Sequence, residues 1–134
     1  MSYAIISQEL EQRLDALGSA LPTVWENTEY KPSNGTAYQR VSILPATTEN
    51  PSVGTGYQKE VGIFQVLLYY PENVGRKDVI AKAEAIKAQF PRGWSVTASN
   101  VRVLIDNSPY ISTAFNSEGW YVMPVSIPFI ADIF

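Results

Sequence analysis

The segment Gly62–Pro71, GIFQVLLYYP, decides the fold, together with Arg76–Phe90, RKDVIAKAEAIKAQF, which follows after a short break. Apolar side chains fill both alternating faces of the first segment, and Gln65 is its only strongly polar residue. A strand of this kind lies inside a sheet with both faces covered, or turns its second face to another protein. The sequence leaves both alternatives open.

The second segment predicts an amphipathic helix. Its apolar positions recur at spacings of four, three and four, at Val79, Ala83, Ile86 and Phe90. Residues 3–17 predict another amphipathic helix, whose apolar stripe is Ile6, Leu10, Leu14 and Leu17. Ser2 can cap the start of this helix, and Gly18 stands where a left-handed residue would end it.

Alternating apolar segments predict the remaining strands. They are residues 23–25, 37–44, 95–97, 101–106, 110–115 and 120–130. Helices and strands in this sequence predict an α+β fold with one mostly antiparallel, mixed sheet and two helices packed on one face, in the order α-β-β-β-α-β-β-β-β. At 134 residues and without an internal repeat, the chain is expected to form a single domain, 1–134.

The last predicted strand contains two prolines, Pro124 and Pro128, which lie four residues apart. In a regular strand both would point the same way along the hydrogen-bonding direction, and neither has an N–H to donate. One edge of this strand is therefore poorly paired, or the strand is bulged. Such an edge either receives a neighbouring subunit or is an ordinary edge strand that proline protects from aggregation.

The connection from Pro45 to Gly56 has prolines and glycines but almost no large apolar residue, so it cannot form a core of its own. Loops of this length are commonly functional or disordered. We expect residues 45–59 to be a mobile loop within the domain. Tyr57, at the end of the loop, and Trp120, opposite the apolar face of the last strand, are the aromatic residues most suited to an interface.

Composition argues against several function classes. The chain has no cysteine and no histidine, so it lacks thiol nucleophiles, zinc–thiolate ligands and histidine-based triads. Its carboxylates are scattered without metal-ligand spacing. We therefore expect no catalytic, cofactor-binding or metal site, and no enzyme activity; an enzyme or small-ligand binder would need a deep pocket with converging polar groups.

Charge and hydropathy give further expectations. The net charge is −3, and Arg76 and Lys77 are the only adjacent basic residues, so sequence-specific binding of nucleic acid is not expected. No apolar run approaches the ~20 residues of a membrane span, and the N-terminal segment does not resemble a signal peptide. The charged fraction of 17% is below the ~25% of ordinary soluble domains, which indicates that a partner covers part of the surface.

Four segments in order resemble the small tail terminator proteins of long-tailed bacteriophages: Leu21–Asn27, Val41–Pro51, Gly62–Pro71 with its helix, and Gly119–Phe129. The resemblance implies a structural subunit of the virion, assembled in the host cytoplasm, that forms a hexameric ring at the head-proximal end of the tail. The ring would cap the tail tube protein, stop tail growth and face the head-tail connector. DNA would pass through its lumen without specific binding, and the family has no catalytic residues to carry over.

The resemblance also implies that the loop around 46–59 faces the tube or a neighbouring subunit. With Gln65 on the second face of its strand, the expected interface residues are Thr47, Thr48, Glu49, Asn50, Val53, Tyr57, Lys59, Gln65 and Trp120. The alternative is another neck or head-tail connector protein with a related fold.

Overall fold

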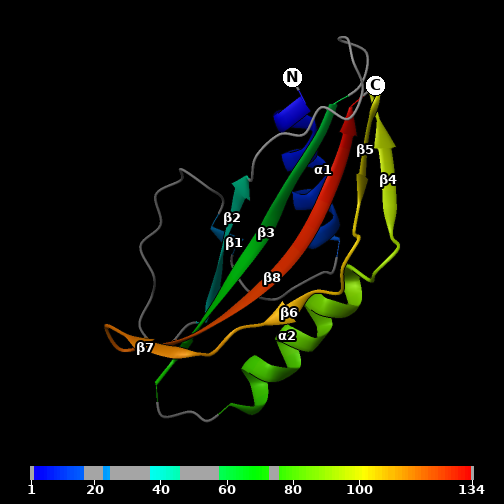
Figure 1. The fold of residues 1–134 in the computed structure, drawn as a ribbon. Helices are drawn as coiled ribbons and strands as arrows, with labels where there is room; N and C mark the ends of the chain where they lie inside the picture. Colours follow the sequence, from blue (N-terminus) through cyan, green and yellow to red (C-terminus); the bar gives the residue numbers. More distant parts are fainter. Residues whose placement is uncertain (1, 17–22, 25–36, 46–57, 73–75, 134) are drawn as a thin grey trace.

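The computed structural model describes residues 2–16, 23–24, 37–45, 58–72 and 76–133 (Figure 1). These residues form two helices and eight strands. In chain order they are α1 (Ser2–Asp15), β1 (Thr23–Val24), β2 (Tyr38–Pro45), β3 (Gln58–Pro71), α2 (Lys77–Gln89), β4 (Ser95–Ala98), β5 (Val101–Leu104), β6 (Tyr110–Ile111), β7 (Phe115–Ser117) and β8 (Trp120–Ile133).

One curled mixed sheet contains every described strand (Figure 1). The strand order is β1-β2-β3-β8-β5-β4, and the short strands β6 and β7 also pair with β8. Only β1 and β2 pair in parallel, and the other pairs are antiparallel. The expected α+β fold is confirmed. The segment expected as one strand, 110–115, instead forms β6 and β7 with three residues between them.

The long strands β3 and β8 form the spine of the sheet. They pair antiparallel over fourteen residues, from Gln58 opposite Ile133 to Pro71 opposite Trp120. On its other side β3 pairs with β2 along the whole of β2. β3 is therefore an interior strand of the sheet, with β2 on one side and β8 on the other.

Both helices contribute to one core on the same face of the sheet. The alternating residues Phe64, Val66 and Leu68 of β3 are fully buried there. The predicted stripes of both helices meet them, since Ile6, Leu10, Leu14, Val79, Ala83, Ile86 and Phe90 belong to the same core cluster. The rings of Phe64 and Phe90 lie 5.8 Å apart, between the sheet and the end of α2.

Polar contacts join the two helices where they end. Arg13 Nε donates to the Gln89 carbonyl and Gln89 Nε2 donates to the Arg13 carbonyl, each at 2.8 Å. The Arg13 guanidinium also lies 4.8 Å from the centre of the Trp94 ring, a cation–π distance. The reciprocal bonds satisfy carbonyls that a helix leaves without a partner at its C-terminus. Gly18, expected to end the first helix, lies outside the described residues.

The two prolines of β8 interrupt pairing without placing the strand at an edge. Pairing with β7, β6 and β5 covers residues 120–122, 125–126 and 130–133, so Pro124 and Pro128 fall in the gaps. The Pro124 carbonyl accepts a hydrogen bond from the Ser112 N–H at 3.0 Å, which shows that its backbone faces this side. The expected poorly paired side is therefore present. An edge position for the strand was wrong, because three short strands share that side.

Candidate interaction surface

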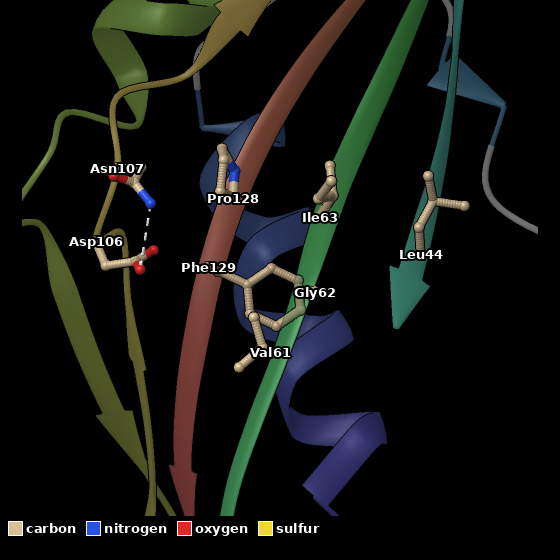
Figure 2. A pocket seen from close by; sticks show the side chains of 8 residues that line it. All are labelled: Leu44, Val61, Gly62, Ile63, Asp106, Asn107, Pro128 and Phe129. Carbon is tan, nitrogen blue, oxygen red and sulfur yellow. Dashed lines mark hydrogen bonds between the residues drawn. The ribbon is translucent and has the colours of Figure 1, made fainter. Parts of the chain in front are cut away.

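The face of the sheet opposite the core carries no described helix. We call it the helix-free face, and in Figure 2 α1 lies behind the strands that form it. The pairing register assigns its central residues: Tyr38, Arg40, Ser42 and Leu44 of β2, Val61, Ile63, Gln65, Leu67 and Tyr69 of β3, and Val122, Pro124, Ser126, Pro128 and Ile130 of β8. Most of these side chains are apolar. The second face of β3 is thus mainly hydrophobic, as its sequence indicates.

Three exposed large hydrophobic side chains lie on this face, spread over β2, β6 and β7. Leu44, Tyr110 and Phe115 are 47%, 46% and 48% exposed, and Ile80 of α2 is the remaining large hydrophobic residue that is exposed in the described part of the chain. Tyr110 pairs with Ser126 and Phe115 with Val122, which puts both side chains on the helix-free face with Leu44. Clustered exposed apolar residues are typical of protein–protein interaction sites.

An aromatic cluster closes one end of the helix-free face. The rings of Tyr38 and Tyr69 stack with centroids 4.6 Å apart and an interplanar angle of 5°. Trp120 stands edge-on to both, at 5.2 Å from Tyr38 and 6.4 Å from Tyr69. Edge-to-face and offset-stacked rings are the favoured aromatic geometries. This end of the face is consequently well packed within the subunit.

A pocket of about 420 Å³ opens farther along the helix-free face (Figure 2). Its lining residues are Leu44, Val61, Gly62, Ile63, Asp106, Asn107, Pro128 and Phe129. A Cβ atom at Gly62 would lie 2.9 Å from Phe129 Cζ and 3.0 Å from the Leu44 carbonyl oxygen. Glycine at this position therefore lets the Phe129 ring lie against the backbone of β3.

Among the described residues that line this pocket, Asp106 is the charged one. Its Oδ2 accepts a hydrogen bond of 3.4 Å from Asn107 Nδ2, and its carbonyl accepts one of 3.2 Å from Arg92 Nε. Its Oδ1 is buried and has no hydrogen-bond partner among the described residues. A buried acceptor without a donor is costly. The Asp106 carboxylate thus lies beside an apolar wall with Oδ1 buried and Oδ2 in an exposed hydrogen bond.

The expected interface residues divide into two groups. Thr47, Thr48, Glu49, Asn50, Val53 and Tyr57 lie outside the described residues. Lys59, Gln65 and Trp120 are half-buried. Gln65 lies on the helix-free face between Ser42 and Ser126.

Lys59 and Trp120 share the helix-free face with Gln65 but are far from each other. Lys59 lies opposite Asp132 at one end of β3, and Trp120 lies opposite Pro71 at the other. The structure therefore does not bring the three residues into one cluster. Sequence reasoning missed Leu44, Tyr110 and Phe115, whose common face depends on strand register, and Asp106, whose place at the pocket depends on tertiary contacts.

The first turn of α2 borders the opposite end of the sheet from the pocket. Burial, and after it the nearby Asp78 carboxylate, raise the pKa of Tyr70 above its ordinary value. Burial lowers the pKa of Lys82, one turn farther along α2. Arg76, Lys77, Asp78 and Ile80 of this first turn are all exposed.

Residues 5–129 match the family model described as phage tail terminator protein. The chain belongs to the phage tail terminator family. It is therefore a structural protein of the phage tail and a component of the virion. Members of this family are tail proteins and not a known class of enzymes. None of the helices described for this tail terminator is long and apolar enough to cross a membrane.

A solved structure whose name states no function resembles this tail terminator over its whole length. It covers 100% of this chain and 98% of its own, with a TM-score of 0.82 and 22% sequence identity. At that identity the likeness supports the fold alone. No curated protein sequence matches the chain.

Proposed function

We propose that this protein caps the tail tube as a ring, with six subunits, and so terminates tail elongation and forms the surface for head–tail joining. Membership of the tail terminator family carries this proposal. The apolar helix-free face supports it, because a subunit that works in an assembly needs a surface for its neighbours.

The proposed partners are further copies of this chain, the tail tube protein and the head–tail connector. We assign the segment predicted as a loop at 45–59 to contacts with the tube or with a neighbouring subunit, although Pro45 ends β2 and residues 58–59 begin β3. Its assigned residues are Thr47, Thr48, Glu49, Asn50, Val53, Tyr57 and, in β3, Lys59. Gln65 and Trp120 belong to the same proposed interface. DNA would pass through the ring, and a net charge of −3 without a strong basic patch suits passage without retention of the phosphates.

Phage particles that lack this protein test the function. A tail terminator predicts tails of uncontrolled, excessive length in electron micrographs. Tails of normal length that fail to join heads would instead identify a head–tail connector and contradict the proposal.

The purified protein provides a second test. Added to purified tail tubes from the same phage, it should bind one end and block further polymerisation of the tube protein. Light scattering after size exclusion, over a range of concentrations, should show assembly toward a ring. A strict monomer that also fails to cap tubes would refute the proposed function.

A further inference from the structure

The pocket on the helix-free face combines two features that call for a specific occupant. Leu44, Ile63 and Pro128 give it an apolar wall, and Leu44 is 47% exposed. Asp106 and Asn107 approach β8 from the other side, as Figure 2 shows. A complementary group would bring an apolar side chain for the wall and a cationic donor for the Asp106 carboxylate, whose Oδ2 accepts an exposed hydrogen bond from Asn107.

The first turn of α2 carries this combination. Ile80 is 38% exposed, and its N–H donates to the Arg76 carbonyl at 2.9 Å, so the two residues are one helical turn apart on one side of the helix. Arg76 occupies the N-cap position without a side-chain capping bond. A cation at the N-terminus of a helix is unfavourably placed with respect to the helix dipole. Arg76 also has no ion-pair partner within the described ranges of this chain.

We propose that the first turn of α2 of one subunit docks into the helix-free-face pocket of the next subunit. Ile80 packs on Leu44, Ile63 and Pro128, and Arg76 donates to the Asp106 carboxylate. This inference rests on the proposed ring and deepens it, because it names the two surfaces through which copies of the chain join.

One subunit cannot fill its own pocket in this way. Ile63 at the pocket and Pro71 before α2 are eight residues apart on β3, which is about 26 Å at about 3.3 Å per residue. Figure 1 shows α2 beginning beyond the end of β3. The two surfaces are different patches of the same chain, so their contact is heterologous. Heterologous contacts generate rings when the rotation closes.

Cysteine cross-linking tests the pairing, because the natural chain has no cysteine. We would prepare Leu44→Cys and Ile80→Cys separately, mix them on purified tail tubes, and oxidise. The expected product is a covalent dimer from the mixture and none from either variant alone. The double variant in one chain should give a ladder of higher oligomers. A dimer formed by Leu44→Cys alone would mean that helix-free faces pack on each other, which overturns the inference.

A charge exchange tests the ion pair separately. Arg76→Asp or Asp106→Arg should raise the concentration needed for assembly about tenfold or more, and the double exchange should restore it to within about threefold. Asp106→Asn keeps the side-chain shape and should weaken assembly while the subunit remains folded by circular dichroism. Lys87→Asp, in the last turn of α2, is the matched control and should leave assembly unchanged.

The outcomes separate the contact from the function. If the protein caps tubes but the mixed cysteine variants do not cross-link and the charge exchange restores nothing, this contact is wrong and the proposed function stands. If the unmodified protein neither assembles nor caps tubes, both fail.

Discussion

Replacing Gly62 with alanine tests how closely β2, β3 and β8 approach one another beside the pocket. The new Cβ would lie 2.9 Å and 3.2 Å from two atoms of the Phe129 ring and 3.0 Å from the Leu44 carbonyl oxygen. Phe129 is only 3% exposed, and Leu44 pairs with the residue after Gly62. The ring and the strand must therefore both shift to admit one methyl group.

The magnitude follows from two opposing effects. Overpacking a well-filled site costs about 1–3 kcal/mol. Alanine in place of glycine within a strand recovers about 0.5–1 kcal/mol, because it reduces the freedom of the unfolded chain. The expected net loss is about 1–2 kcal/mol in the free energy of unfolding. For a chain of this size that loss lowers Tm by roughly 3–10 °C.

Urea unfolding, monitored by tryptophan fluorescence, measures this loss. An unchanged m-value would show that the substitution altered stability and not the surface exposed on unfolding. Phe129→Leu removes the ring atoms that would clash with the new Cβ. The double variant Gly62→Ala/Phe129→Leu should therefore lose about 1 kcal/mol less unfolding free energy than the sum of the two single losses. Gly119→Ala is the comparison for backbone strain alone, because its φ is +87° and no atom lies within 4 Å of the new Cβ. A Gly62→Ala protein as stable as the wild type, or an additive double variant, would refute the reasoning.

Three further predictions concern single side chains. Phe115→Ser should change the free energy of unfolding by less than about 0.5 kcal/mol, since the side chain is half exposed, yet weaken assembly in light scattering. Arg102→Ala removes the 2.8 Å ion pair to the largely buried Asp132 and should lower the free energy of unfolding, measured in urea, by about 1–2 kcal/mol. Above pH 10 the free energy of unfolding of Tyr70→Phe should rise relative to that of the wild type, because the raised pKa keeps folded Tyr70 protonated while the unfolded tyrosine ionises. Unfolding free energies with the same pH dependence in both proteins would contradict this.

Local periodicity determines much of this fold, and the sequence shows it directly. The two helical stripes and the core face of β3 follow from spacing alone, and all of their described members join one core. The position of β8 does not follow from its own residues. Two prolines indicate an edge strand when each residue is considered alone, but they fit an interior strand whose neighbours β5, β6 and β7 are short enough to leave gaps.

The candidate surface could be predicted only in part. Gln65 marks the second face of β3 because it is the polar exception in an apolar strand. Tyr110 and Phe115 come from a segment that the sequence presents as a single strand, and only their pairing with Ser126 and Val122 places them on that face. Asp106 is one of thirteen acidic residues. It differs in having a buried oxygen with no hydrogen-bond partner in the described part of the chain, which depends on tertiary contacts.

The paired strands β3 and β8 connect the stability of the subunit to the geometry of the proposed ring. Residues 62 and 63 line the pocket at one end of β3, and α2 follows its other end. A heterologous ring closes at a fixed number only if its two contact surfaces keep a constant angle. A fourteen-residue antiparallel ladder between them supplies that rigidity. Gly62→Ala, which displaces Phe129 or the Leu44 backbone, should therefore disturb ring closure even at temperatures where the subunit remains folded.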